Sequence, residues 1–442
     1  MVNDLKDLMR QNVAAPPPDH LDVDAVVGAG RRRVRTRRRA GIAGVALAAA
    51  GIVALGTVLV PDGGDRAMPA SRPPAPDAPT ITLADATPAV EGRDYRELAS
   101  YTNQNLDADN GQYFDGVTDD GLILFRDGPR EGQWFPRFAL MDPATGAKDW
   151  LPRLAGVAQD QTWPIVLGAD RLVLLSLHNG LRGDLQAHVY DRAAGRWSTL
   201  TWPGLPKVDL LRAVAGPDDR LYVMVPATRG RVPEGGWPTG PDGEADDADA
   251  EGDTSHLWSV SLEDTTDARD EGLVVGDLAF TDTAMVWTDR SGGDPGNVHV
   301  RDLATGAEHS FDPRTGERCN LLSFSASGDR IVMSEYCGTY DEGRDDRVQI
   351  LSTDGDQVVT IQGDGIDGWL PDGSEVVNVT AYPLEQGGTY VYDLPTDRFL
   401  RVSKGVSPWA RGGPTGTPAQ FLWDTPVNDR HGDTQHLAEL LR

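Results

Sequence analysis

The sequence predicts an all-β protein: a seven-bladed β-propeller, closed by its N- and C-terminal strands and preceded by a single transmembrane helix. Two observations predict the propeller. A short apolar run recurs seven times after residue 80, and most runs lead into a hairpin whose turn begins with Asp. The third observation predicts the helix, because 21 uncharged residues follow an arginine-rich run.

Charge is distributed unevenly along the chain. The 442 residues include 68 acidic and 41 basic side chains, giving a formal net charge of −27. Residues 1–39 hold nine basic and five acidic side chains, residues 40–60 hold none, and the remainder carries −31. A basic head on an acidic body is typical of a chain that crosses a membrane. The acidic body argues against nucleic acid as a partner, because phosphate binding requires a positive surface.

Residues 1–39 form a basic tail that we expect in the cytoplasm. Its arginine run consists of Arg31, Arg32, Arg33, Arg35, Arg37, Arg38 and Arg39. Arginines beside a membrane span keep that flank in the cytoplasm and attract anionic headgroups. The tail is too short to bury a core, so it either contacts a cytoplasmic partner or is a disordered juxtamembrane segment.

The uncharged stretch at residues 40–60 is AGIAGVALAAAGIVALGTVLV. As a helix it is about 31 Å long, and a bilayer core is about 30 Å thick. We therefore expect a single-pass protein of the cell membrane, with its N-terminus inside and the acidic domain outside. The alternative is a cleaved signal peptide of the twin-arginine kind, although the apolar core of signal peptides is usually shorter, at about 7–15 residues.

Residues 61–79 form a linker with six prolines, which is typical of a semi-stiff spacer. The predicted propeller occupies residues 80–442. Its seven apolar runs are LILF (122–125), LVLL (172–175), LYVMV (221–225), AMVW (284–287), IVM (331–333), VVNV (376–379) and QFLW (420–423). Their first residues lie 44 to 63 positions apart, and continuous runs of this length are typical of strands covered on both faces.

A second element follows each run. The clearest copies are MDPATG (141–146), YDRAAG (190–195) and RDLATG (301–306). Asp at the start of such a turn accepts a backbone N–H, and Gly then adopts positive φ. One more short strand follows each turn, so every unit has four strands. The C-terminal segment TQHLAELLR (434–442) and TITLAD (80–85) are expected to share the last blade and to close the ring.

Two segments of the repeat, GWLPDGSEVVNV (368–379) and LSFSASGDRIVMSEY (322–336), resemble the Trp-Ser-Pro-Asp-Gly repeat of TolB-type propellers. Leu370 stands where that family has Ser, and the Gly-His and Trp-Asp pairs of WD repeats are absent. The resemblance covers residues 80–442 as architecture. With 37 Arg against four Lys, the whole layout resembles membrane-anchored propeller proteins of high-GC Gram-positive bacteria. The resemblance implies a binding scaffold rather than a fixed chemistry.

Cys319 and Cys337 are the only cysteines, and they are equidistant from Gly328 in a predicted hairpin turn. An antiparallel hairpin centred there places them opposite each other, and the space outside the membrane is oxidising. We therefore predict a cross-strand disulfide. The alternative is two buried free thiols. Two cysteines without a paired His do not make a zinc site, and we expect neither a metal nor another cofactor.

The sequence contains no established catalytic motif: Gly-x-Ser-x-Gly, His-Glu-x-x-His and the phosphate loop are all absent. The loops between second and third strands are long and varied, whereas the turns between first and second strands are short. Long loops on a rigid scaffold are where binding usually resides. The candidate ligand residues on them are Asp289, Arg290, Asp341, Glu342, Arg344, Asp345, Asp346, Asp429 and His431. Plain solvated loops are the alternative.

The function expected from these features is an extracytoplasmic binding or interaction module for a protein, peptide or cell-wall ligand. A sensory role, in which occupancy is relayed to the tail, is one form of it. The alternative is an extracytoplasmic propeller enzyme such as a glycan lyase or hydrolase, which needs two carboxylates at the channel mouth. A deep central pocket with two buried carboxylates favours the enzyme, and a broad shallow face favours binding.

Overall fold

The structure is a computed structural model. It describes residues 78–104, 112–128, 136–154, 162–178, 183–208, 212–232, 251–314, 319–337, 346–382, 386–405, 414–427 and 432–442. The predicted membrane span at 40–60, the tail at 1–39 and nearly all of the linker lie outside these ranges. Within them, the one helix is the three-residue 3-10 turn η1 (Leu83–Asp85), and no helix has the length and apolarity needed to cross a membrane.

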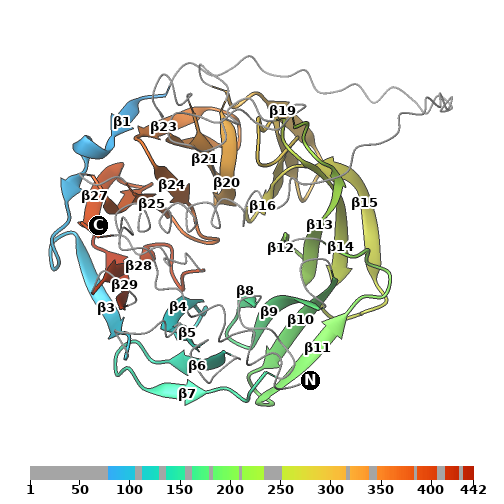
Figure 1. Cartoon of the computed structure of the whole chain (residues 1–442), viewed down its shortest axis with the longest axis horizontal. Coiled ribbons are helices and arrows are strands. Elements are labelled where there is room, and N and C mark those ends of the chain that lie inside the picture. Colours follow the sequence, from blue (N-terminus) through green and yellow to red (C-terminus); the bar gives the residue numbers. More distant parts are fainter. Residues whose placement is uncertain are drawn as a thin grey trace, which may run out of the picture. The chain divides into compact units, whose positions relative to one another are not determined.

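Seven sheets surround a central axis, which confirms the seven-bladed propeller (Figure 1). Each sheet is one blade, and its first strand lies nearest the axis. Blade 1 comprises β4 (Gln112–Val117), β5 (Ile123–Asp127), β6 (Arg137–Met141) and β7 (Lys148–Trp150). Blade 2 comprises β8 (Trp163–Leu167), β9 (Arg171–His178), β10 (Asp184–Asp191) and β11 (Arg196–Thr201). Blade 3 comprises β12 (Ala213–Gly216), β13 (Arg220–Thr228), β14 (Thr254–Ser261) and β15 (Ala268–Val275).

The remaining blades follow the same meander. Blade 4 comprises β16 (Leu278–Phe280), β17 (Ala284–Thr288), β18 (Val298–Asp302) and β19 (Glu308–Phe311). Blade 5 comprises β20 (Asn320–Ser327), β21 (Arg330–Tyr336), β22 (Arg347–Ser352) and β23 (Gln357–Gln362). Blade 6 comprises β24 (Ile366–Trp369), β25 (Val376–Ala381), β26 (Gly388–Asp393) and β27 (Arg398–Ser403). The described strands of blade 7 are β28 (Gln420–Pro426), β29 (Asp433–Leu440) and β3 (Tyr95–Thr102).

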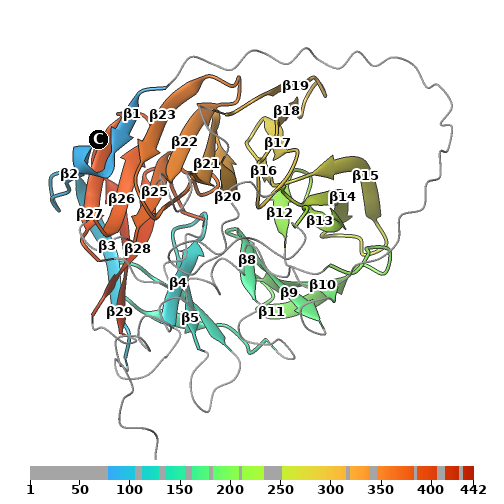
Figure 2. The ribbon, with the colours of Figure 1, turned by 45° about the horizontal axis from the view of Figure 1, so that its top comes forward.

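The ring is closed by an N-terminal and a C-terminal strand, as predicted, but the N-terminal strand is a different one. β3 pairs antiparallel with β29 in blade 7. TITLAD instead lies outside blade 5, where β1 (Thr80–Thr82) pairs parallel with β23, and β2 (Thr87–Pro88) then pairs parallel with β27. We call residues 78–102 the N-terminal strap, because they run along the outer edges of three successive blades (Figure 2).

The expected position of TITLAD was wrong because its apolar side chains already have a core of their own. Leu83 is 4% exposed and packs with Val359, Ile361 and Tyr392 between blades 5 and 6, and Ile81 packs against the same cluster. β3 offers a weaker apolar pattern, since its residues alternate between half-buried and exposed. Fully burying a leucine is worth about 1.5–3 kcal/mol, so this contact helps to fix the first strand of the strap on blades 5 and 6.

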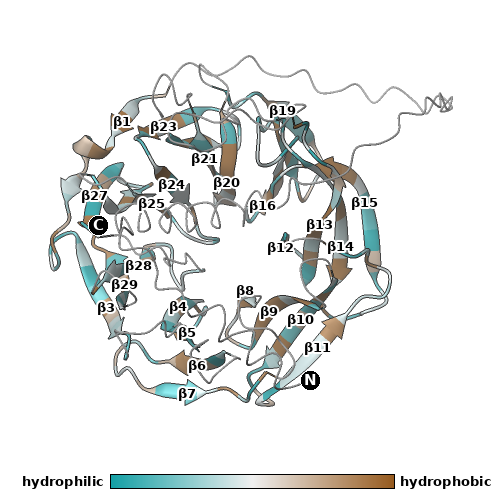
Figure 3. Cartoon of the chain, viewed as in Figure 1, coloured by the Kyte–Doolittle hydropathy of each residue, from teal (hydrophilic) through white to brown (hydrophobic). Residues whose placement is uncertain are grey.

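The apolar runs form the buried middle of the blades. In β9, five consecutive residues from Leu172 to Ser176 are buried, whereas the outermost strand β15 is mostly exposed. Figure 3 shows the same gradient, with hydrophobic colour concentrated on middle strands such as β9 and hydrophilic colour on β7 and part of β15. Each blade therefore packs apolar faces against both neighbours, as continuous apolar strands require.

The hairpins between third and fourth strands have the predicted chemistry. Gly146, Gly195 and Gly306 adopt φ values of 69°, 65° and 70°. The Asp142 carboxylate accepts the Ala144 N–H at 2.8 Å, and the other two turns contain equivalent bonds. Positive φ is disfavoured for residues with a Cβ, which explains why each turn ends in glycine.

The predicted disulfide is confirmed, with 4.5 Å between the Cα atoms of Cys319 and Cys337. Its register depends on a β-bulge. Ser327 pairs with Arg330 at the turn, but Asn320 pairs with Tyr336, so one extra residue is accommodated between Leu321 and Ser323. Without this bulge, the two cysteines would be offset by one position on strands β20 and β21.

Candidate functional site

The blades present two different surfaces around the axis. The turns that join first to second and third to fourth strands lie at one end of every blade, because the first and third strands run in the same direction. We call this surface the turn face. The opposite surface, the loop face, carries the loops from second to third strands and the connections between blades.

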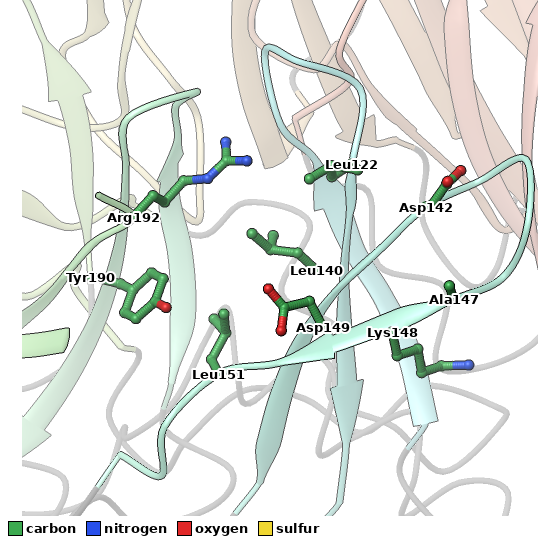
Figure 4. A pocket seen from close by; sticks show the side chains of 9 residues that line it. All are labelled: Leu122, Leu140, Asp142, Ala147, Lys148, Asp149, Leu151, Tyr190 and Arg192. Atoms are coloured by element: carbon green, nitrogen blue, oxygen red, sulfur yellow. The ribbon is translucent and has the colours of Figure 1, made fainter. Parts of the chain in front are cut away.

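A pocket of about 490 Å³ opens on the turn face between blades 1 and 2. Its lining residues are Leu122, Leu140, Asp142, Ala147, Lys148, Asp149, Leu151, Tyr190 and Arg192 (Figure 4). Ligand sites in proteins are usually concave, apolar and about 300–1,000 Å³ in volume, so this pocket has the size of a binding site.

The floor of the pocket is formed by residues at the margin of the hydrophobic core between the two blades. Leu140, Leu151 and Tyr190 belong to that core and are 7–8% exposed, and Leu122 packs against them. The Tyr190 ring lies 5.0 Å from the Trp197 ring, and the Trp197 indole N–H donates to the Pro152 carbonyl across the seam at 2.8 Å. These contacts hold the floor in place, because both aromatic rings are packed on two sides.

Alternation along β7 gives the pocket its charge. Successive side chains of a strand point to opposite faces. Asp149 directs its carboxylate into the space between the blades, whereas Lys148 points away from it (Figure 4). The Lys148 ammonium lies 4.3 Å from the Tyr101 ring centroid and 4.5 Å from that of Phe125, and burial lowers its pKa. Asp149 is exposed, and its side chain has no hydrogen bond or ion pair with any residue that the structure describes.

An ion pair across the seam fixes the rim of the pocket. Arg192, from the third-to-fourth turn of blade 2, donates two hydrogen bonds of 2.7 and 2.8 Å to the Asp120 carboxylate of blade 1. A third bond of 3.1 Å goes to the Gly168 carbonyl. The hydrogen bonds from Arg192 are the main reason that the pKa of Asp120 falls to about 2. A bidentate pair of this kind fixes geometry as well as charge.

Tyr190 is the one hydroxyl that lines the pocket. Burial and the nearby negative charge of Asp149 raise the pKa of Tyr190, so its hydroxyl stays protonated and can donate at neutral pH. That hydroxyl has no hydrogen-bond partner among the described residues.

The turns next to the innermost strands carry carboxylates from several blades. Asp119, Asp282 and Asp372 come from the first-to-second strand turns of blades 1, 4 and 6. Asp372 is exposed by surface area, but partial desolvation of its carboxyl group raises its pKa, and the negative charges of Asp282 and Asp119 raise it further. All three side chains are solvent-exposed.

Three of the nine candidate residues predicted on the loop face lie within the described ranges. Asp289 accepts hydrogen bonds from His299 at 2.7 Å and from the Asn297 backbone at 2.8 Å. Burial opposes ionisation of Asp289, but these hydrogen bonds outweigh it and lower its pKa. The Arg290 side chain is half-buried and makes no hydrogen bond.

Asp346 is 1% exposed and accepts the Gly365 backbone N–H at 2.9 Å, so its carboxylate stabilises a connection between blades 5 and 6. The other six candidates are Asp341, Glu342, Arg344, Asp345, Asp429 and His431, and they lie outside the described residues. The geometry thus brings no described pair of these nine together at a common cavity, and the nomination of the loop face stays a prediction.

Glu335 is the acidic group nearest the disulfide. Its carboxylate and the two sulfur atoms lie within 4.8 Å of one another, and all three residues are buried. Burial raises the pKa of Glu335, against the opposing effect of the Arg347 guanidinium at 2.8 Å. Because the sulfurs are bonded to each other, they are not thiolate ligands, and Glu335 is held by hydrogen bonds from Arg347 and Gln349.

Comparison with known proteins shows no family. No protein-family model and no curated protein matches the sequence. Solved structures are similar in fold, among them one of two prolyl endopeptidases (14% identity, TM-score 0.42, covering 77% of this chain and 46% of that one). Others are an acylaminoacyl peptidase from Pyrococcus horikoshii (10%, 0.45, 77% and 53%) and the propeller domain of the Trilobed protease from Pyrococcus furiosus (8%, 0.38, 66% and 81%). The aligned region spans about half the length of the first two.

Proposed function

We propose that the protein is a binding module whose propeller takes a ligand in the pocket between blades 1 and 2. The observation that supports this most is a preformed pocket with an apolar floor and an unpaired Asp149, placed on a rim that an ion pair holds open. A small number of polar groups that converge over an apolar floor is typical of ligand sites. No described residue in the pocket combines a nucleophile with a hydrogen-bonded base, as covalent catalysis requires.

Site-specific photocrosslinking tests this binding function. A photoreactive residue replaces Ala147, which is exposed on the pocket rim, and in a matched control it replaces Asp364, which is exposed on the loop face. The proposal expects a discrete adduct on living cells at position 147, absent at position 364. The same adduct should disappear when Asp149→Arg fills the pocket with a long cationic side chain. Equal labelling at both positions, or an adduct indifferent to Asp149→Arg, contradicts a ligand in this pocket.

The location belongs to the same proposal. The arginine run and the uncharged stretch at 40–60 support an anchored protein with its propeller outside the cytoplasmic membrane, tethered by the Pro-rich linker. Protease added to intact cells should therefore digest the acidic domain while cytoplasmic proteins survive. Complete protection of that domain, in cells where a known external protein is digested, contradicts this orientation.

The enzyme alternative has one observation in its favour. A carboxyl group that keeps its proton to higher pH can act as a general acid, and the charges of Asp282 and Asp119 contribute to the raised pKa of Asp372. If the channel cleaves glycosidic bonds, Asp372→Asn should abolish release of reducing ends from cell-wall polysaccharide, whereas Asp149→Asn should leave it intact. Purified protein that releases none under any condition removes this alternative.

A further inference from the structure

We infer that the pocket between blades 1 and 2 binds a basic side chain, lysine or arginine, presented on a polypeptide beside an apolar neighbour. This inference rests on the proposed binding function and names the ligand class of its site. Three features carry it: the unpaired charge of Asp149, the prior engagement of both cations at the pocket, and the apolar floor.

Asp149 supplies a carboxylate with nothing to neutralise it. Its side chain makes no hydrogen bond or ion pair, although it faces the gap between the blades (Figure 4). Lys148, its neighbour in β7, has its ammonium over the Tyr101 and Phe125 rings on the opposite side of the strand. The carboxylate of Asp142 is partly engaged, because it accepts the Ala144 N–H. The open charge of the pocket is therefore negative.

Arg192 does not make the open charge of the pocket positive. Its two terminal nitrogens already donate to both oxygens of Asp120 and to the Gly168 carbonyl. An anionic ligand would have to displace Asp120, with a loss of two short charge-assisted bonds. A cationic ligand displaces nothing, because it meets Asp149 directly and leaves the Arg192 pair intact.

The floor suits the aliphatic stem of a basic side chain. Leu122, Leu140 and Leu151 line the pocket together with Asp149, and Tyr190 lines it from blade 2. Lysine and arginine bury their methylene stems on apolar surface while keeping the charged head in water. At about 490 Å³ the pocket is larger than one such stem, so it also accommodates an adjoining apolar residue.

The net negative charge of the chain also favours a basic ligand. The chain carries a net charge of −27, and residues 61–442 alone account for −31. A surface of one sign attracts ligands of the other and raises their association rates, with a strong dependence on ionic strength. A basic segment is thus attracted to the acidic domain before it contacts Asp149.

Fluorescence anisotropy with three labelled pentapeptides tests the inference on the full-length protein in detergent. The peptides are Gly-Leu-X-Leu-Gly, with X as lysine, norleucine or glutamate. Norleucine keeps the apolar stem and lacks the ammonium, so the lysine peptide should bind about tenfold more tightly than the norleucine peptide. The glutamate peptide should not bind. Asp149→Asn should remove the tenfold advantage of lysine, whereas the matched control Asp364→Asn should leave it unchanged.

The outcomes separate this inference from the binding function on which it rests. Equal affinity for lysine and norleucine, or no effect of Asp149→Asn, overturns the basic ligand class while the adduct at position 147 still supports binding. No binding of any peptide, with that adduct retained, overturns it as well. Loss of the adduct itself is the separate result that overturns the binding function. Circular dichroism of each variant checks that the fold is retained.

Discussion

The two halves of the ring protect their outer edges in different ways. Blades 5, 6 and 7 are covered by the N-terminal strap, which adds β1, β2 and β3 to their outer edges. In blades 1 to 4, the outer strands β7, β11, β15 and β19 have no further strand paired to them among the described residues. We call these the strapped half and the open half.

Charge distinguishes the covered edge of blade 5 from an uncovered edge. β15 in the open half carries Arg269, Asp270 and Glu271, whereas β23 in the strapped half carries no charged side chain. An exposed, uncharged edge strand is a template for aggregation, and charged side chains or a covering strand prevent it. β27, which β2 covers, nevertheless carries Arg398 and Arg401, so the comparison teaches that the strap protects an uncharged edge in blade 5 and closes the ring in blade 7. The open half leaves its seams accessible, and the pocket lies in one of them.

Removing the strap should have the largest effect. Deletion of residues 78–102 leaves blade 7 without β3, so the ring loses its closure between the first and last parts of the chain. We expect loss of cooperative unfolding, measured by urea denaturation followed with circular dichroism. Deletion of residues 78–86 alone is the matched control. It removes β1 and the buried Leu83 and should cost about 2–3 kcal/mol. Equal effects of the two deletions would show that β3 does not close the ring.

In the open half, the next largest effect should come from a buried ion pair. The Arg126 Nε lies 2.5 Å from the Asp115 carboxylate, and their side chains are 2% and 1% exposed. Arg126→Met leaves Asp115 buried without its partner and should cost about 3–5 kcal/mol in the free energy of unfolding. The double variant with Asp115→Leu should recover most of that loss. A single variant of wild-type stability would mean that Asp115 is solvated after all.

Acid should weaken the open half through His188. This residue is 1% exposed, bonded to Ser176 at 2.8 Å and Thr199 at 3.0 Å, and burial lowers its pKa to about 4. The unfolded chain binds a proton near pH 6.5, so stability present above that pH is lost as the pH falls toward 4. The full loss is about 3 kcal/mol. Chemical denaturation from pH 7 to 4 measures it, and His188→Gln should lack this component.

The smallest effect should come from the ion pair at the pocket rim. Arg192 and Asp120 are 15% and 40% exposed, and exposed pairs usually contribute about 0–1 kcal/mol. Arg192→Gln should therefore shift the unfolding midpoint only slightly. A loss above about 2 kcal/mol would mean that this pair, like the strap, holds blades together.

The periodic parts of the fold were predictable, and the exceptions have local causes. The seven apolar runs lie in the expected strands, because burial on both faces demands continuous apolar sequence. Cys319 and Cys337 face each other as predicted, although the hairpin turn centres half a residue away from Gly328 and the bulge restores the register. TITLAD was assigned to the wrong blade. The apolar residues of a strand predict that the strand is buried, but they do not predict which blade it packs against.

The pocket was not predictable in the same way. Tyr190 and Arg192 belong to YDRAAG. The turn pattern explains Asp191 and Gly195, but it predicts no role for the residues on either side of Asp191. The one signal was Arg192 itself, since the corresponding turns have proline and leucine at that position. Asp149 lies in a three-residue strand, and the seam it faces is formed by a blade that starts more than ten residues later. A site between two repeats depends on contacts that no single repeat encodes.

The strap also determines when the molecule can be completed during synthesis. Arg96 in β3 and Glu439 in β29 bond to each other across 343 positions of sequence. A ribosome adds about 5–20 residues per second, so β3 waits on the order of 20–70 s for β29. The nascent chain cannot pair β3 with β29 in blade 7 during that interval. Pairing of β3 with β29 completes the ring, and any factor that shields β3 would act before this step.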